Sequence, residues 1–336
     1  MQLRRFQHAP PGLAECAATE LAGFLGGPAL VHVQGRRDPP LLVSVLLHGN
    51  EQSGWNGVRR LLDRAVELPR SLLLFIGNVA AAAANLRTLP HQQDYNRIWR
   101  GASGAEGALA REVLDLLTHR PLFAALDLHN NTGHNPHYSV LTDLNADNLG
   151  LAYLFSEKAV YVEEPDTVMT RAIADRHPAL AVELGPIGDP RCDDRAHDFV
   201  SRCLALDAIP AADATALELY RAEVRVHVAD EAPFSFAGDG LDTPLVLTSG
   251  VEGVNFHPLA AGTEFGAANS PVAQLLRVLD ANHQDVTDSY FERRDGSIVL
   301  RQPVVPAMYT TDPLVIRQDC LCYFMKRMEL ADARRL

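Results

Sequence analysis

A histidine and a glutamate lie three residues apart just after a strongly apolar run. Residues 41–47 (LLVSVLL) lead into His48, and Glu51 follows after Gly49 and Asn50. Imidazole and carboxylate groups both bind zinc well, and a catalytic zinc has three protein ligands and an open position for water. Gly49 is expected to let the backbone turn sharply between the two side chains. The pair is therefore a candidate for two ligands of one metal ion.

The spacing alone does not establish a metal site. Two other histidine–acid pairs in the chain have the same spacing, and a glutamate in the first turn of a helix also interacts favourably with the helix dipole. Only His48 and Glu51 lie where a buried strand ends and a helix is expected to begin. In open α/β sheets, binding sites lie at the carboxyl ends of the strands. Position therefore favours this pair as ligands.

A third ligand is expected at the end of another strand. The apolar run 122–128 leads directly into His129. His134 and His137 follow in the same polar loop and are interpreted as solvated loop histidines. Asp127 precedes His129 by two residues and points to the same face of the strand. It either supports His129 or is a buried polar residue with a backbone partner, and the sequence does not decide between the two.

One acidic residue interrupts a further apolar strand. Glu183 lies within residues 180–184 (LAVEL), just before Gly185 and Pro186. Burial of an unpaired carboxylate costs several kcal/mol, which favours a functional role over a structural ion pair. A carboxylate in a dry cleft is suited to act as the general base for a metal-activated water. Glu183 is therefore the candidate base.

The elements that position these residues follow an alternating pattern up to about residue 206. Continuous apolar runs are typical of buried strands, and apolar residues at helical spacing lie between them. Strands are expected at residues 41–47, 71–77, 122–128, 138–141, 160–162 and 180–184. Helices are expected at residues 52–66, 106–118, 167–176 and 194–206. The pattern predicts an α/β domain with a mixed, mainly parallel sheet flanked by helices.

The pattern changes after residue 210. Residues 220–228 alternate between apolar and polar side chains, which is typical of a half-exposed antiparallel strand. Short apolar runs separated by Gly and Pro then continue toward the end of the chain. The length of 336 residues is also that of about two domains. We therefore predict a catalytic domain at residues 1–208 and a second, smaller, mostly β domain at residues 209–336.

The overall composition excludes several classes of function. Thirty Lys and Arg residues against 42 Asp and Glu give a net charge of −12, which repels nucleic acid. The longest uncharged apolar run, residues 71–86, is shorter than the about 20 residues that cross a bilayer. The first residues show no signal peptide, and the five cysteines form no CxxC pair. We expect a cytoplasmic protein with no nucleic-acid or membrane partner.

Five segments, taken in order, resemble the aspartoacylase/succinylglutamate desuccinylase family, a branch of the zinc carboxypeptidase superfamily. HGNE at 48–51 is similar to the first zinc motif of that family, and DLHN at 127–130 is similar to the second. VELGP at 182–186 resembles its catalytic-base segment. Residues 85–87 resemble its Asn-Pro-Arg element with Leu in place of Pro, and residues 94–97 its Asp-x-Asn-Arg element. The resemblance covers about residues 40–200 and implies a zinc-carboxypeptidase-like fold.

The resemblance implies a role for each matching residue. One Zn²⁺ per chain would be held by His48, Glu51 and His129. Glu183 would activate the water and pass its proton to the leaving amine, and Arg87 would help to stabilise the oxyanion. The departure from the family at Leu86 and the histidine-rich loop after His129 concern the shape of the substrate more than the zinc chemistry.

Further residues would bind substrate or support the zinc ligands. Asn96 and Arg97 would hold a substrate carboxylate, which the planar guanidinium fork matches well. Asp94 would orient a zinc-bound histidine, His48, from behind. Arg171 corresponds to another substrate-binding arginine of the family, although a surface helix arginine explains it equally well. Tyr309 either comes near the site or, as we favour, is a half-buried tyrosine of the β domain.

Together these features predict a zinc-dependent hydrolase that cleaves the amide bond of a small, anionic N-acyl amino acid. The alternatives are a metallocarboxypeptidase acting on peptides and, with less support, a catalytically inactive binding protein of the same fold. A structural metal site agrees less well with three ligands and a nearby acid. Local arginines must offset the net negative charge around an anionic substrate. The acyl group, the amino acid and the existence of a homo-oligomer are left open by the sequence.

Overall fold

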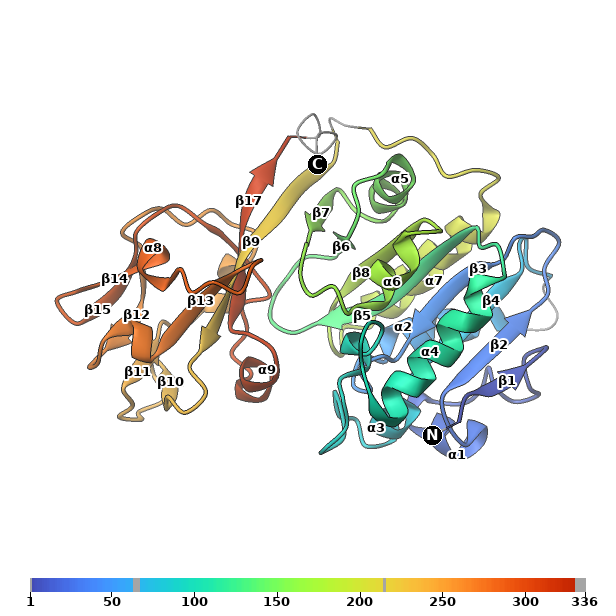
Figure 1. The fold of residues 1–336 in the computed structure, drawn as a ribbon, viewed down its shortest axis with the longest axis horizontal. Coiled ribbons are helices and arrows are strands. Elements are labelled where there is room, and N and C mark those ends of the chain that lie inside the picture. Colours follow the sequence, from blue (N-terminus) through green and yellow to red (C-terminus); the bar gives the residue numbers. More distant parts are fainter. Residues whose placement is uncertain (1, 63–66, 214–215, 330–336) are drawn as a thin grey trace. The chain divides into compact units, whose positions relative to one another are not determined.

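The computed structural model describes residues 2–62, 67–213 and 216–329, and the chain forms two compact units (Figure 1). Of the described residues, the first unit contains 2–62, 67–131, 137–213, 216–219 and 329, and the second contains Thr132–Pro136 and Tyr220–Met328. The chain thus changes unit at Leu219, a little after the boundary expected at residue 208. The short segment Thr132–Pro136 belongs with the second unit, a feature that local sequence pattern does not indicate.

The first unit is built on a mixed, mainly parallel sheet, which confirms the predicted fold class. Its strands are arranged in the order β1-β2-β4-β3-β5-β8-β6-β7. β2 pairs with β4 and β6 with β8 in antiparallel fashion, and the other neighbours are parallel. The strands are β1 (Arg4–Phe6), β2 (Ala29–Val33), β3 (Leu41–Val45), β4 (Leu72–Ile76), β5 (Ala124–Asn131), β6 (Tyr138–Leu141), β7 (Lys158–Tyr161) and β8 (Ala179–Pro186).

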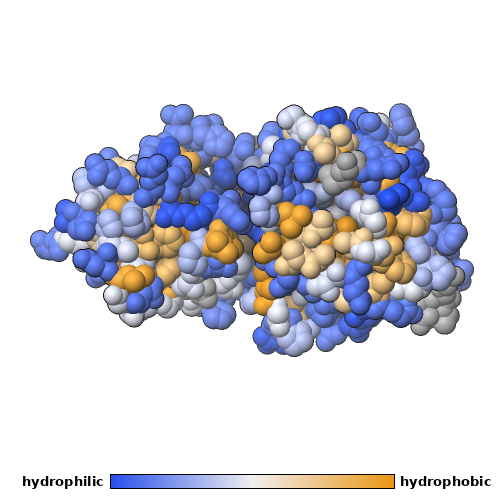
Figure 2. All heavy atoms as spheres, turned by 90° about the horizontal axis from the view of Figure 1, so that it is seen from below, coloured by the Kyte–Doolittle hydropathy of each residue, from blue (hydrophilic) through white to orange (hydrophobic). Residues whose placement is uncertain are grey.

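Helices connect these strands. They are α1 (Leu21–Leu25), α2 (Ser53–Arg59), α3 (Val79–Ala83), α4 (Gly104–Thr118), α5 (Ala146–Phe155), α6 (Met169–Ala174) and α7 (Arg191–Ala205), with 3₁₀ turns η1 (Ala18–Glu20), η2 (Arg60–Leu62) and η3 (Tyr95–Arg97). The helix expected at 52–66 is α2 followed by η2, and residues 63–66 lie outside the described residues. Among the described residues, none of the helices is both long and apolar enough to cross a membrane. Figure 2 shows a surface on which polar residues predominate.

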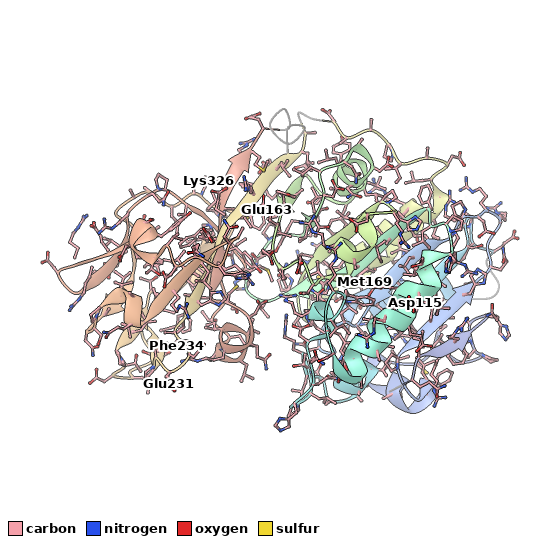
Figure 3. All side chains as sticks on the ribbon, in the orientation of Figure 1. Asp115, Glu163, Met169, Glu231, Phe234 and Lys326 are labelled. Carbon is pink, nitrogen blue, oxygen red and sulfur yellow. The ribbon has the colours of Figure 1, made fainter. Side chains whose placement is uncertain are left out.

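Helices cover the sheet on both faces. On one face, α4 and α6 pack on the strands through a core that includes Leu109, Val113 and Met169. Figure 3 labels Met169 together with Asp115, an exposed residue of α4. On the other face, α7 contacts β3 and β8 and packs against α2. A Cβ at Gly57 would lie 2.6 Å from the Cβ of Ala196, so only glycine permits this close helix pair.

The second unit is mostly β, as predicted. In one sheet β9 (Glu218–Val228) pairs with β13 (Leu276–Asp280), and β17 (Cys322–Met328) pairs with β16 (Val305–Ala307). The second sheet has the order β10-β11-β12-β15-β14. Its strands are β10 (Phe234–Phe236), β11 (Leu245–Leu247), β12 (Glu264–Ala268), β14 (Phe291–Arg294) and β15 (Ser297–Leu300). Short helical segments complete the unit: η4 (Val251–Val254), η5 (Val272–Gln274), α8 (Thr287–Tyr290) and α9 (Pro313–Gln318).

Tyr309 lies in the aromatic core of this second unit. Its side chain is only 1% exposed, and its ring stacks on Phe265 with 5.1 Å between the centroids. Phe291 and Phe324 pack against the same Phe265 ring. Burial raises the pKa of the Tyr309 hydroxyl well above its usual value. These contacts favour the interpretation of Tyr309 as a core residue, more deeply buried than the sequence suggested.

Candidate metal centre

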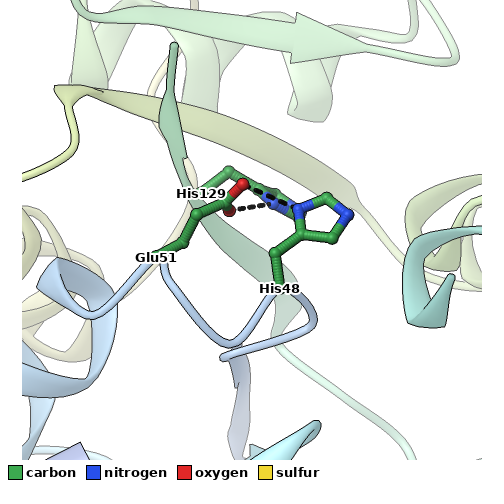
Figure 4. A group of neighbouring side chains, drawn as sticks. All are labelled: His48, Glu51 and His129. Atoms are coloured by element: carbon green, nitrogen blue, oxygen red, sulfur yellow. Dashed lines mark hydrogen bonds and ion pairs between the residues drawn. The ribbon is translucent and has the colours of Figure 1, made fainter. Parts of the chain in front are cut away.

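The side chains of His48, Glu51 and His129 lie together at the carboxyl ends of two adjacent parallel strands. β3 leads into the turn that carries His48 and Glu51, and His129 lies within β5. All three side chains are buried, and their ligand atoms lie within 4.8 Å of one another. The Nδ1 atoms of His48 and His129 are 2.7 and 2.8 Å from the two oxygens of Glu51 (Figure 4). The convergence expected from the sequence is therefore present.

Each histidine is also held from behind by a carboxylate. The Nε2 atom of His48 is 3.0 Å from Oδ1 of Asp94, and Nε2 of His129 is 3.0 Å from Oδ2 of Asp127. Such outer carboxylates fix the ring orientation of metal-binding histidines and leave the other nitrogen for the metal. Asp127 thus supports His129, which decides between the two interpretations that the sequence left open. Two imidazoles and a carboxylate form a donor set that suits catalytic zinc.

Gly49 is required for a reason different from the one expected. Its φ is not in the left-handed region. Instead, a Cβ at this position would lie 2.2 Å from the backbone nitrogen of Ala82 and 2.3 Å from the carbonyl carbon of Ala81. The turn between His48 and Glu51 therefore packs directly on the backbone of α3, and any side chain at position 49 would push the two candidate ligands away from it.

Asn130 is a further residue of the site that the sequence analysis missed. Its backbone N–H donates to Oε2 of Glu51 at 3.3 Å. Its side chain donates to the carbonyl of Gly185 at 3.0 Å and accepts a hydrogen bond from the backbone N–H of Ser53 at 3.2 Å. Asn130 thus joins β5 to β8 and to the start of α2, and it fixes the Glu51 carboxylate. The sequence analysis included Asn130 in the DLHN segment but assigned no role to it.

The buried charges of this group are strongly coupled. Burial alone would lower the pKa of His48, but the carboxylates of Glu51 and Asp94 raise it. Burial would likewise lower the pKa of His129, and Asp127 and Glu51 raise it well above its usual value. Burial opposes ionisation of Glu51, yet the two histidines lower its pKa. The two histidines therefore favour the ionised form of Glu51. A metal ion bound at the same place would favour it in the same way.

Arg87 faces the same group from the segment after α3. Its Nη2 atom donates to Oδ2 of Asp94 at 3.2 Å, and its Nη1 atom is 3.8 Å from Oε1 of Glu51. Burial raises the pKa of the Asp94 carboxyl, but His48 and Arg87 hold it well below its usual value. Arg97 lies near enough to lower the same pKa further. The backbone N–H of Asn96 donates to Oδ1 of Asp94 at 2.7 Å. The structure thus brings these arginines to the edge of the candidate metal centre.

Glu183 lies beside the metal-binding group on the neighbouring strand. It is the register partner of His129 in the β5/β8 pair. Its Oε2 atom is fully enclosed and has no hydrogen-bond partner within the described residues. Burial raises the pKa of the Glu183 carboxyl to about 7, although His129, His48 and Arg87 act in the opposite direction. A carboxylate with one enclosed, unpaired oxygen and this pKa is suited to accept and return a proton near neutral pH.

Arg171 and the loop histidines have other surroundings. Arg171 of α6 donates to the carbonyls of Thr142 and Glu163, so its role in substrate binding stays a prediction. His134 is exposed, as expected. His137 is not a solvated loop histidine, since its ring is half-buried against Phe155 with 5.7 Å between the ring centroids.

A reciprocal pair of amides anchors the segment that carries Arg87 and Asp94. Asn78 donates to Gln92 at 2.8 Å, and Gln92 donates back to Asn78 at 3.2 Å. Gln92 also accepts a hydrogen bond from the backbone N–H of Leu89 at 3.0 Å. Asn78 is fully buried at the start of α3, where it accepts from the backbone N–H of a residue in the first turn. The pair fixes the backbone two residues before Asp94.

The Gln92→Ala variant is expected to lose up to about tenfold in zinc affinity and in kcat/KM. Loss of a group that bonds directly to a metal ligand typically costs about 10–100-fold, and Gln92 acts on Asp94 only through the intervening backbone, so its effect should not exceed the lower figure. Without Gln92, Asp94 is held less firmly against His48. The Gln93→Ala variant is the matched control, since Gln93 is exposed and bonds only away from the centre, to Ser103 and Glu106. Zinc titration against a chromophoric chelator measures the affinity. Equal values for both variants would remove Gln92 from this role.

The described geometry defines the first unit as an α/β domain with a candidate site for a divalent metal ion. Such a site is typical of metal-dependent hydrolases. Residues 37–206 match the family model of the Succinylglutamate desuccinylase/Aspartoacylase catalytic domain. This match spans just over half of the 336 residues, and the chain belongs to this family of deacylases. The resemblance stated from the five sequence segments is thereby confirmed.

Solved structures of low sequence identity share the fold. Succinylglutamate desuccinylase from Chromobacterium violaceum is 16% identical, with a TM-score of 0.56 over 90% of this chain and 89% of that chain. Succinylglutamate desuccinylase/aspartoacylase from Rhodobacter sphaeroides is 14% identical, with a TM-score of 0.61 over 89% of each chain. Murine aminoacylase 3 is 17% identical, with a TM-score of 0.57 over 87% of this chain and 97% of that chain. No curated protein sequence matches the chain significantly.

Proposed function

We propose that this chain is a zinc-dependent amidohydrolase that cleaves the amide bond of a small N-acyl amino acid. The observation that carries the proposal is the buried group of His48, Glu51 and His129 with the unpaired Glu183 carboxylate on the neighbouring strand. Membership of a deacylase family supports the same reaction class. Location in the cytoplasm and assembly into a homo-oligomer stay predictions.

His48, Glu51 and His129 would hold the zinc ion. Zinc in such a site supplies Lewis acidity and lowers the pKa of water. Glu183 takes the proton from the attacking water and gives it to the amine that leaves, since its enclosed carboxyl has a pKa of about 7. The Arg87 guanidinium, 3.8 Å from Glu51, supplies positive charge for the oxyanion that develops on the amide carbonyl.

The substrate carboxylate would be bound by Arg97, with Asn96 beside it. A guanidinium matches a carboxylate with two parallel hydrogen bonds. The chain as a whole carries a net charge of −12, yet distant surface charges are screened by salt, whereas Arg87 and Arg97 act at short range. The fold is shared with proteins described as succinylglutamate desuccinylase and aminoacylase 3, which supports a small acylated amino acid as substrate.

A hydrolysis screen of the zinc-loaded protein tests this proposal. The substrates are N-acetyl, N-formyl and N-succinyl amino acids together with short peptides. Turnover of one or more N-acyl amino acids, and none of the peptides, is the expected result. Preferential cleavage of peptides would favour a metallocarboxypeptidase, and binding of the same compounds without turnover would favour an inactive binding protein. Either outcome would overturn the proposal.

The Arg97→Lys variant is expected to lower kcat/KM for carboxylate-bearing substrates about tenfold, which corresponds to about 1.4 kcal/mol. Lysine keeps the charge but cannot form the two parallel hydrogen bonds. The loss should be largely in KM, and substrates with an amidated carboxylate should be affected much less. Arg100→Lys is the control, because Arg100 bonds to Arg171 and Asp175 instead. Unchanged kinetics in Arg97→Lys would argue against an anchoring role.

A further inference from the structure

A second concave region of the first unit lies away from the candidate metal centre. It has a volume of about 270 Å³. The edge strand β1, the next strands β2 and β4, and the carboxyl end of α4 line it. His32 of β2 and Leu73 of β4 are register partners there, and Leu73 is in turn the partner of Leu42 in β3. These positions are near the amino ends of β3 and β4. The cavity therefore lies toward the amino ends of these strands, whereas His48 follows the carboxyl end of β3.

The polar side chains that line this cavity are almost all basic. They come from β1, β2 and the residues after α4, and they are Arg5, His32, His119 and Arg120, with the amide of Gln7 beside them. None of the described residues that line the cavity is acidic. In a chain with a net charge of −12, counted with neutral histidines, the two arginines bring positive charge to this cavity.

In the described residues 2–62, 67–213 and 216–329, the side chains of Arg5, His32, His119 and Arg120 form no hydrogen bond and no ion pair. Burial and then the nearby charge of Arg120 lower the pKa of His32, and only Asp38 acts in the opposite direction. Arg120 thus disfavours a positive charge on His32, and an anion bound beside them would offset this repulsion.

The apolar part of the cavity restricts the class of ligand. Leu30 and Leu73 are buried lining residues, and Phe6 and Leu116 complete the apolar lining. The volume is just below the range of about 300–1,000 Å³ that is typical of sites for drug-sized ligands. The negative end of the α4 dipole disfavours an anion, so binding must come from the side chains. The guanidinium groups of Arg5 and Arg120 can each bind a carboxylate or a phosphate through two parallel hydrogen bonds.

We propose that this cavity binds a small organic anion, with its carboxylate or phosphate group between Arg5 and Arg120 and a compact apolar part against Leu30 and Leu73. This site is separate from the metal centre, and the proposal does not depend on the proposed hydrolase function.

Calorimetric titration of the full zinc-loaded chain, at constant ionic strength, tests the proposal with three probes. Phenyl phosphate has both a phosphate and an apolar ring, inorganic phosphate lacks the ring, and benzoate replaces the phosphate by a carboxylate. We expect saturable binding of phenyl phosphate that is tighter than that of inorganic phosphate. The comparison with benzoate distinguishes the two anionic groups. Absence of saturable binding for all three probes would overturn the proposal.

Variants locate the binding. Arg5→Ser/Arg120→Ser should weaken phenyl phosphate binding by about tenfold or more, whereas Arg202→Ser, an exposed arginine of α7, should leave it unchanged. His129→Ala, which alters the metal centre, should also leave it unchanged. Binding that survives in the double variant but is lost in His129→Ala would place the anion at the metal centre and contradict the proposal. The charge-retaining Arg5→Lys/Arg120→Lys variant should bind with intermediate affinity, which separates lost contacts from misfolding.

Discussion

The His129→Ala variant will retain far less than one zinc ion per chain and will lose hydrolytic activity. His129 supplies one of three converging ligand atoms, and its removal leaves only His48 and Glu51 to hold the ion. Loss of an outer partner of a ligand already costs about 10–100-fold in metal affinity, and loss of the ligand itself is expected to cost more. The effect should therefore exceed that of Gln92→Ala.

Metal analysis after dialysis against a weak chelator measures this outcome. His137→Ala is the matched control, because His137 lies eight residues further along and packs on Phe155 instead of the centre. The control should keep stoichiometric zinc. Full occupancy in both His129→Ala and His48→Ala would remove these histidines as ligands.

Thermal unfolding gives a second readout that does not depend on activity. An ion that binds only the folded state stabilises it in proportion to the logarithm of its concentration over Kd. A strong chelator should therefore lower the Tm of the wild type and of His137→Ala, and it should have little effect on His129→Ala. An equal effect of the chelator on all three proteins would mean that the stabilising ion is bound elsewhere.

The convergence of the candidate ligands could be predicted because parallel strands end at one edge of a sheet. The sequence placed His48 and His129 at the ends of two such strands, and the structure adds that these strands, β3 and β5, are adjacent and parallel. The apolar run 180–184 likewise placed Glu183 in β8, the next strand. Continuous apolar runs are typical of strands that are buried on both faces of a sheet, so these elements could be recognised from the sequence.

The outer partners could not be derived in the same way. Gln92 meets Asn78 only because the segment after α3 folds back over that helix, and nothing in its local pattern indicates this path. Asp127 is on the same strand face as His129, yet whether it bonds to the ring or to backbone depends on side-chain rotamers. Asn130 contributes a backbone N–H to Glu51, and backbone donors have no signature in residue type. These contacts are determined by tertiary packing.

The Glu183→Gln variant is expected to keep its zinc and lose at least about 100-fold in kcat, the scale of a positioned proton-transfer group. The amide has nearly the shape of the carboxylate but cannot accept the proton of the attacking water. Glu183→Asp retains a base that is one methylene further away and should fall between the wild type and Glu183→Gln. Single-turnover kinetics with metal analysis of the same samples measure both quantities.

Two measurements distinguish a general base from a structural residue at position 183. They are the pH dependence of kcat/KM and the Tm of the Glu183→Gln variant. A base must be ionised, so wild-type kcat/KM should fall as the pH is lowered through the pKa of Glu183, which is about 7 and which a bound cation would shift to lower pH. This limb should be absent in Glu183→Gln. The Oε2 atom of Glu183 is enclosed and unpaired, and a neutral amide is less costly to bury than a charge, so the variant should melt no lower than the wild type at pH 8. A lower Tm together with lost zinc would instead make Glu183 a structural part of the centre, and near-native turnover would exclude it as the base.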